Sequence, residues 1–222
     1  MVLTLYGTDL SPPTRAVRLV CAALGVDYEY KLISLLAGEH KKPEFLKINP
    51  HHTVPTIQDD DFALWDSHAI AVYLAEKSGN HTWYPKDARK RATIHQRLHF
   101  DDSMLFTKMK DVLVPLFYGT ASEFQAEKVQ RLQESLDQLD LIISDGGWLV
   151  GSTPTIADCC AAASVSSIMS VLPQLAVTGR TAAWLSRCER ELPGYATLNT
   201  PGAVGLGQAA QQQILKRKSG SQ

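Results

Sequence analysis

Residues 2–17 read Val-Leu-Thr-Leu-Tyr-Gly-Thr-Asp-Leu-Ser-Pro-Pro-Thr-Arg-Ala-Val and predict a buried strand that leads into a helix. The short run of apolar and β-branched residues at 2–6 is typical of a buried strand. Ser11 supplies an N-cap oxygen, and Pro12 stands where a missing N–H costs nothing. Apolar residues then keep helical spacing until Gly25, which ends the predicted helix.

The pattern extends outward from this strand and helix. Residues 28–33 predict a second strand, so that strand, helix and strand form a βαβ unit with parallel strands and a right-handed crossover. Short strands at 56–58 and 62–64 lie close enough together to form a hairpin. A further helix, with its cap at residue 66 or 67, is expected to end at Gly79. The first 80 residues therefore predict a compact α/β unit.

Beyond this unit only helical spacing remains. We predict a linker at 81–87 and an all-helical domain at 88–222, so the fold class is α/β plus all-α. Residues 122–125 and 155–158 each have the pattern of a capping box at a helix start. Further helices are expected at 94–116, 129–143, from 155 to near Pro173, around Trp184, and in the tail at 208–222.

Composition narrows the function classes. The 222 residues carry 22 basic and 23 acidic side chains, so no broad positive field is present and nucleic acid is not an expected partner. No apolar run approaches the ~20 residues that a membrane-spanning helix needs. Four cysteines without a Cys-x-x-Cys pair or paired metal-ligand spacings favour a reducing compartment. We expect a soluble intracellular protein.

Ser11 is the first candidate for chemistry. A hydroxyl just after a strand and at a helix start lies in the positive end of the helix dipole, and we expect free N–H groups beside it that stabilise an anion. The alternative is that Ser11 is an N-cap and nothing more. No Gly-x-Ser-x-Gly elbow is present, so the sequence offers no local support for a serine hydrolase.

The second candidate is the segment Asn-Pro-His-His-Thr-Val-Pro-Thr at 49–56. If the bond between Val54 and Pro55 is cis, the N–H and C=O of Val54 point outward at an edge that can pair with a peptide-like ligand. His51 and His52 would face opposite ways in an extended segment, so we expect no shared metal ion.

The third candidate is the next helix start, where Asp66 and Ser67 place a carboxylate and a hydroxyl beside further N–H groups. The alternative for this pair is capping alone.

Taken together, these segments resemble the cytosolic glutathione transferases over nearly the whole chain. More narrowly, five segments are similar to the insect epsilon class, with the delta class next nearest. They read Ser-Pro-Pro-Thr-Arg-Ala-Val at 11–17, Leu-Leu-Ala-Gly-Glu-His at 35–40, Lys-Pro-Glu-Phe at 42–45, Asn-Pro-His-His-Thr-Val-Pro at 49–55 and Asp-Ser-His-Ala-Ile at 66–70. The resemblance implies a thioredoxin-like domain at 1–80 followed by the helical domain. Because Ser-Pro-Pro-Thr replaces the thioredoxin Cys-x-x-Cys, disulfide exchange by that motif is excluded.

The resemblance also implies roles for individual residues. Ser11 would donate a hydrogen bond to the sulfur of glutathione and lower the thiol pKa. The glutathione-binding residues it implies are His40, His52, Thr53, Val54, Pro55, Asp66, Ser67 and His68. Within that set, the Val54 backbone holds the cysteinyl part, Asp66 and Ser67 hold the γ-glutamyl end, and His40 and His52 lie near the glycine carboxylate. The family usually has Glu at position 66. His68 would lie near the subunit interface, coupled to Asp101; a His without a ligand is the alternative for each His.

By the same resemblance, the electrophile would meet the sulfur in an apolar pocket formed by Pro13, Leu35, Phe106, Met109, Lys110, Leu113, Phe117 and Tyr118. By spacing alone, Phe106, Met109 and Leu113 are more often core than pocket residues. The activity implied is glutathione conjugation in the detoxification of xenobiotics, insecticides included, with dehydrochlorinase or peroxidase side activity. The resemblance further implies a cytoplasmic homodimer without a metal. A carrier of hydrophobic ligands or hormone precursors is the alternative function.

Overall fold

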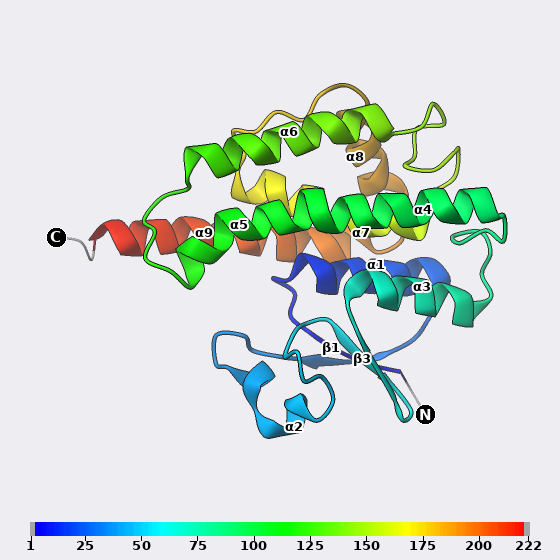
Figure 1. The fold of residues 1–222 in the computed structure, drawn as a ribbon, viewed down its shortest axis with the longest axis horizontal. Coiled ribbons are helices and arrows are strands. Elements are labelled where there is room, and N and C mark those ends of the chain that lie inside the picture. The colour runs from blue at the N-terminus through cyan, green and yellow to red at the C-terminus, as the bar shows by residue number, and fades with distance from the viewer. Residues whose placement is uncertain (1–2, 220–222) are drawn as a thin grey trace.

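The computed structural model describes residues 3–219, and Figure 1 shows a small sheet below a larger group of helices. Within these residues the sheet has four strands in the order β2-β1-β3-β4: β1 (Thr4–Gly7), β2 (Glu29–Leu32), β3 (Thr56–Asp59) and β4 (Phe62–Trp65). As predicted, β1 and β2 are parallel, and β3 and β4 form an antiparallel hairpin. Val2, the first residue of the predicted strand, lies outside the described residues.

Helices α1 (Pro12–Leu24) and α3 (Ser67–Ser78) lie between the sheet and the other helices (Figure 1). Gly25 ends α1 in the left-handed conformation, with φ of 69°, and Gly79 ends α3 in the same way. Between β2 and β3 the chain forms a 3-10 turn (Glu39–Lys41) and the short α2 (Pro43–Leu46). This half of the molecule confirms the predicted thioredoxin-like arrangement.

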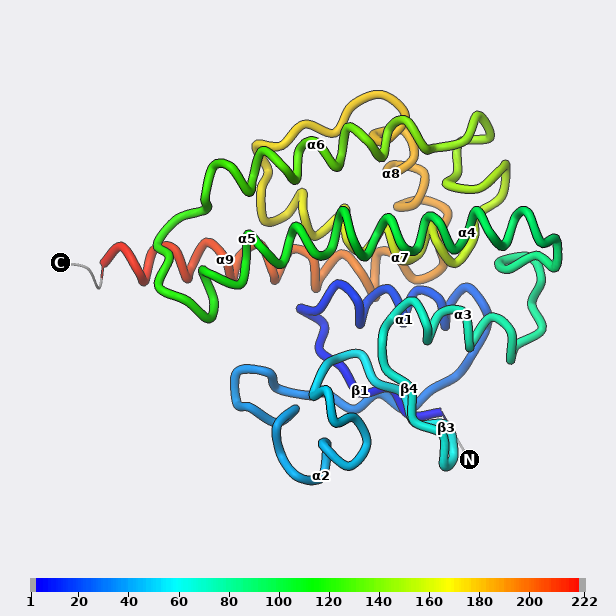
Figure 2. The backbone as a smooth tube through the Cα atoms, viewed as in Figure 1, coloured from blue at the N-terminus to red at the C-terminus, as the bar shows by residue number. Residues whose placement is uncertain are grey.

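The remaining helices form the second half of the molecule. A long rod consists of α4 (Ala88–Phe100), a π-helical segment (Asp101–Phe106) and α5 (Thr107–Phe117), and α6 (Ala126–Ile142) runs beside it (Figures 1 and 2). Next come α7 (Ile156–Val171), α8 (Gly179–Glu191), a second π-helical segment (Tyr195–Asn199) and α9 (Thr200–Ser219). The small side chains of α7 are mostly buried, and α7 contacts α1, α4, α8 and α9. It is the central helix of the fold.

Two of the predicted helix starts need correction. The capping box at 122–125 does not form, because the chain still bends around the end of α5 there and α6 begins only at Ala126. The last helix begins at Thr200 and not at 208, and its predicted end at 220–222 lies outside the described residues. The start was predicted too late because glycine has a low helix propensity. The structure shows why glycine is needed: a Cβ at Gly207 would lie 2.3 Å from the Ser170 carbonyl oxygen, so only glycine permits this close approach. The capping box at Thr155 is confirmed.

Candidate active site

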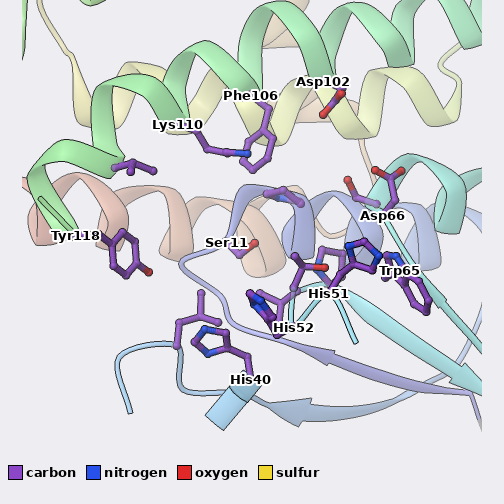
Figure 3. A pocket seen from close by; sticks show the side chains of 17 residues that line it. Ser11, His40, His51, His52, Trp65, Asp66, Asp102, Phe106, Lys110 and Tyr118 are labelled. Carbon is purple, nitrogen blue, oxygen red and sulfur yellow. The ribbon is translucent and has the colours of Figure 1, made fainter. Parts of the chain in front are cut away.

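A cavity of about 540 Å³ lies between the sheet half and the π segment with α5. Figure 3 shows Ser11 facing this space, with His40, His51 and His52 on one side and Phe106 and Lys110 on the other. The lining residues are Ser11, Pro13, Leu35, His40, His51, His52, Thr53, Val54, Pro55, Trp65, Asp66, Ser67, Asp102, Phe106, Lys110, Val114 and Tyr118. The fold thus gathers in one place residues from segments as far apart as positions 11 and 118.

Ser11 caps α1 from the wall of this cavity. Its backbone is extended, and its Oγ accepts a hydrogen bond from the Thr14 N–H at 3.3 Å. A serine hydroxyl has one proton to donate and two lone pairs. Because the cap uses a lone pair, the hydroxyl proton remains available to an anion in the cavity.

The first turn of α1 differs from the prediction in one respect. We expected free N–H groups beside Ser11, but Pro12 and Pro13 have none and the Thr14 N–H is bound to Ser11. Among the described residues, no N–H of this turn remains for a ligand. Ser11 therefore presents a hydroxyl and the helix dipole, without the backbone donors that usually accompany a helix start.

The segment before β3 is organised by Asn49, whose side chain is fully buried. Its amide nitrogen donates to the Thr53 carbonyl at 3.1 Å and to the Thr56 hydroxyl at 2.9 Å. The bond between Val54 and Pro55 is cis. Within residues 3–219 the Val54 N–H and C=O form no hydrogen bond with the chain, so both are available at the cavity wall.

The three histidines of this wall lie closer together than the sequence suggested. His52 has φ of 46°, so the segment is not extended at this point, and His51 and His52 line the same cavity. The His51 ring stacks on Trp65, and the His52 ring centroid lies 6.0 Å from that of His40. Burial lowers the pKa of His40, as do the neighbouring Lys41 and His52. The buried Nδ1 of His40 has no partner in the described chain.

Asp66 and Ser67 form the other polar end of the cavity. Asp66 is the N-cap of α3, and its Oδ1 accepts from the N–H groups of His68 and Ala69 at 3.0 and 2.9 Å. Its φ of 74° is unusual for a residue with a side chain and costs on the order of 1–3 kcal/mol. Such strain recurs at ligand sites. Asp102, from the π segment, also lines the cavity and lies above Asp66 in Figure 3.

His68, predicted to bind glutathione, is not among the residues that line this cavity. Its Nε2 lies 2.8 Å from Asp101 Oδ2, as the predicted coupling of the two residues requires. Burial is the largest influence and opposes a charge on the ring, but the interactions with Asp101 and Cys160 together outweigh it and raise the pKa of His68. The pair joins the first turn of α3 to the π segment.

The two faces of α5 explain which pocket residues lie elsewhere. Phe106, Lys110 and Val114 are spaced by four residues and line the cavity. Met109 and Leu113 are 1% and 8% exposed and pack in the core, and Phe117 packs against the core without lining the cavity. For Met109 and Leu113 the core alternative holds, because they lie on the face of α5 that packs into the core and not on the face that lines the cavity.

Residues 3–219 contain no arrangement typical of a metal site or of a membrane-spanning helix. No group of three or more His, Cys, Asp or Glu side chains is arranged to hold a metal ion. No helix in this range is both long enough and apolar enough to span a bilayer. The four cysteines are buried, and burial raises their thiol pKa values, to about 12 for Cys21.

Comparisons with known proteins identify the family. The chain matches the models of the glutathione S-transferase N-terminal domain over residues 1–76 and of the C-terminal domain over residues 122–191. It is 41% identical over 206 residues to glutathione S-transferase 1 of Manduca sexta, a match that covers 91% of this chain and 94% of that one. The chain belongs to the glutathione S-transferase family.

Solved structures place this transferase among its insect relatives. It matches a delta-class glutathione transferase of Nilaparvata lugens with a TM-score of 0.88 and 37% identity, over 95% of this chain and 99% of that one. It matches an epsilon-class enzyme of the housefly, Musca domestica, with a TM-score of 0.88 and 35% identity, over 95% and 98%. The likeness extends to both classes and does not separate them.

Some residues of the transferase cavity were not predicted as ligand contacts. Trp65, Asp102 and Val114 received no role from the sequence, and His51 was considered only as a metal ligand. For two of these residues the sequence pattern could have predicted a place in the cavity. Trp65 directly precedes the Asp-Ser helix start, and Val114 continues the spacing of Phe106 and Lys110.

Proposed function

We propose that this transferase joins the sulfur of glutathione to electrophilic carbons of apolar compounds, and that Ser11 is its catalytic residue. The main support is the position of the Ser11 hydroxyl, which lies in the cavity wall. Its oxygen accepts the capping hydrogen bond from Thr14 N–H through a lone pair. Its proton is then free to bind a sulfur anion. A hydrogen bond to a charged group contributes about 1.5–3 kcal/mol. That energy corresponds to a lowering of the thiol pKa by roughly one to two units.

Glutathione fits the polar side of the cavity as an extended tripeptide. The free backbone groups of Val54, between Thr53 and Pro55, are suited to pair with the cysteinyl residue as an added strand would. Asp66 offers its second carboxylate oxygen to the γ-glutamyl ammonium, while Ser67 offers donors to the α-carboxylate. At the opposite end, the rings of His40 and His52 lie 6.0 Å apart and line the part of the cavity where the glycine carboxylate would bind.

The other wall suits the second substrate. Pro13, Leu35, Phe106 and Tyr118 present apolar surface, and the Lys110 ammonium lies 5.5 Å from the Phe106 ring centroid. In the reaction the thiolate attacks the electrophilic carbon, a carbon–sulfur bond forms, and the leaving group departs with its electron pair. A cation beside this wall favours electron-poor or anionic acceptors. The same thiolate would support dehydrochlorination or peroxide reduction as side activities.

We also assign the chain to the epsilon class, on the joined motifs at 11–17, 35–40, 42–45, 49–55 and 66–70. We place the enzyme in the cytoplasm, where its buried, unpaired thiols are stable. The proposed division is a glutathione-binding domain at 1–80, a linker at 81–87, and a helical domain at 88–222 that carries the acceptor wall.

A homodimer is proposed through the face of α3 and α4. A groove of about 560 Å³ there is lined by apolar side chains among polar ones, a mixed composition that suits a subunit interface. The apolar members are Leu64, Ala69, Val72 and Leu98. Sedimentation velocity at micromolar protein concentration tests this assembly, and a monomer at all concentrations would contradict it.

Turnover of a chromogenic aryl halide tests the proposed function. Ser11→Ala should lower kcat/KM below neutral pH by about 10- to 100-fold, because each unit of thiol pKa is a tenfold change in thiolate. Ser11→Thr keeps a hydroxyl and a cap and is the matched control. If wild type binds glutathione but shows no rate that depends on Ser11, the carrier alternative holds in place of the enzyme.

A further inference from the structure

Arg15 is buried in the middle of the molecule, away from the cavity lining. It lies in the first turns of α1 and is 0% exposed. Its hydrogen bonds go to the Asp9 carbonyl, the Asn199 side chain and the Ser167 hydroxyl, and no carboxylate of residues 3–219 forms an ion pair with it. Burial lowers the pKa of Arg15 to about 10, which leaves it charged at neutral pH. Burying a charge without an ion-pair partner is costly, so we ask what the hydrogen bonds of Arg15 hold in place.

These connections hold the turn that carries Ser11. Nη1 of Arg15 donates to the Asp9 carbonyl at 2.7 Å, two residues before Ser11. The Arg15 backbone N–H donates to the Ser11 carbonyl at 3.1 Å, and the Ser11 N–H donates to the Thr8 carbonyl at 3.0 Å. Ser11 is therefore fixed on both sides: the Arg15 side chain holds the Asp9 carbonyl before it, and the N–H groups of Thr14 and Arg15 bind it from α1.

The other two bonds of Arg15 lead to the helical half. Nε donates to Asn199 Oδ1 at 3.0 Å, and Nη2 donates to the Ser167 hydroxyl on α7. Asn199 is itself buried and donates to Ser166 at 2.9 Å. The guanidinium fork thus bridges the turn before α1 to α7 and to the segment before α9, a geometry that lysine cannot reproduce.

A second, independent contact braces the same turn. A Cβ on Gly202, in the first turn of α9, would lie 2.1 Å from the Asp9 carbonyl oxygen and 2.7 Å from Arg15 Cδ. The backbone of α9 therefore packs directly on the carbonyl that Arg15 holds. The Asp9 carboxylate takes no part, because it turns outward to Arg18 and to the Tyr30 hydroxyl.

We propose that Arg15 is a positioning residue that sets the place of the Ser11 hydroxyl relative to the helical wall of the cleft. This inference rests on the proposed role of Ser11. The helical half also carries Phe106 and Lys110, so a fixed bridge from Ser11 to α7 sets the distance between the thiolate and the acceptor. A misplacement of about 1 Å at such a site can cost on the order of a hundredfold in rate.

The test compares Arg15→Lys with Arg18→Lys, an arginine one turn along α1 that touches Asp9 only through its carboxylate. Folded protein, checked by circular dichroism, is saturated with glutathione, and the pKa of the bound thiol is read from thiolate absorbance together with kcat and KM for an aryl halide. We expect Arg15→Lys to raise the bound-thiol pKa by about one unit. We also expect kcat to fall about tenfold or more with KM for glutathione little changed. Arg18→Lys should alter none of these.

Ser167→Ala provides a second variant that keeps the guanidinium and removes one of its acceptors. It should move the thiol pKa and kcat in the same direction as Arg15→Lys, and it decides the matter if Arg15→Lys does not fold. The inference is overturned if Ser11→Ala has its expected effect but folded Arg15→Lys leaves the thiol pKa and kcat unchanged. Where Arg15→Lys is unfolded, unchanged values in Ser167→Ala overturn it in the same way. If Ser11→Ala also has no effect, the proposed function is what fails.

Discussion

The helices α1 and α3 both begin at the cleft, and they leave different groups for a ligand. At α1, two prolines and the cap on Thr14 remove the first-turn N–H donors, so Ser11 offers one hydroxyl. At α3, Asp66 caps two N–H groups with one oxygen, while its second oxygen and the Ser67 N–H have no partner in residues 3–219. The N-terminus of α1 therefore suits a single sulfur anion. The N-terminus of α3 suits a group that carries both an ammonium and a carboxylate. A helix N-terminus is thus not one kind of site, because the side chains decide what remains available.

The two starts are also held differently. The first turn of α3 is tied to the π segment by the ion pair of His68 and Asp101, whereas α1 is tied to α7 by the hydrogen bonds of Arg15. Variants at the two helix N-termini should therefore show which contacts contribute to the free energy of unfolding and which contribute to glutathione binding and turnover.

The largest effect is expected from Asp101→Ala, which leaves the His68 charge buried without its partner. Loss of one member of a buried pair costs about 3–5 kcal/mol of the free energy of unfolding. Because the folded pKa of His68 is raised, the contribution is complete below its unfolded value of about 6.5 and is lost as pH rises through the folded pKa. Urea denaturation at several pH values measures the difference.

The control for this prediction is Asp102→Ala, the next residue along, whose side chain is exposed. It should change the free energy of unfolding by no more than about 0.5 kcal/mol. Equal losses for the two variants, or a loss that grows with pH, would contradict the role given to the ion pair.

Asp66→Asn tests the α3 start as the site of the γ-glutamyl ammonium. The amide oxygen can still cap the helix, but the charge is gone, so KM for glutathione should rise by about 10- to 100-fold while stability changes little. Asp66→Ala should add a loss of about 0.5–2 kcal/mol in stability from the missing cap. Steady-state kinetics and thermal unfolding measure the two effects. An unchanged KM in Asp66→Asn would remove this role.

A smaller effect is expected at the opposite end of the tripeptide. The pKa of His40 is lowered, so the ring is neutral at pH 7 and gains a charge as pH falls, and the carboxylate of a bound ligand favours that charged form. The affinity for S-methylglutathione, which has no thiol to titrate, should rise about fivefold between pH 7.5 and pH 5. Isothermal titration calorimetry with His40→Gln should show no such rise. His81→Gln, at an exposed position between α3 and α4, should behave as wild type.

Local signals made much of this fold predictable. Ser11 before two prolines and Gly25 after the last apolar residue mark both ends of α1, and the structure agrees. The start of α9 was missed because the reason for Gly202 and Gly207 lies in neighbours distant in sequence. Met109 and Phe106 could not be told apart, since spacing gives two apolar faces but not which one meets a cavity.

The geometry of the histidine wall depends on the bonds that Asn49 makes across its own loop. These bonds set a backbone that residue types alone do not specify. The same holds for Arg15, whose partners at Ser167 and Asn199 are more than 150 positions away.

We propose that the first turn of α1 offers one donor, the Ser11 hydroxyl, and that this donor ionises the sulfur of glutathione. The most direct measurement is a pH titration of thiolate absorbance for glutathione bound to wild type and to Ser11→Ala. We predict a thiol pKa about one to two units below that of free glutathione in wild type, and a return toward the free value in the variant. A bound thiol that titrates in wild type as it does free in solution would show that Ser11 does not ionise it.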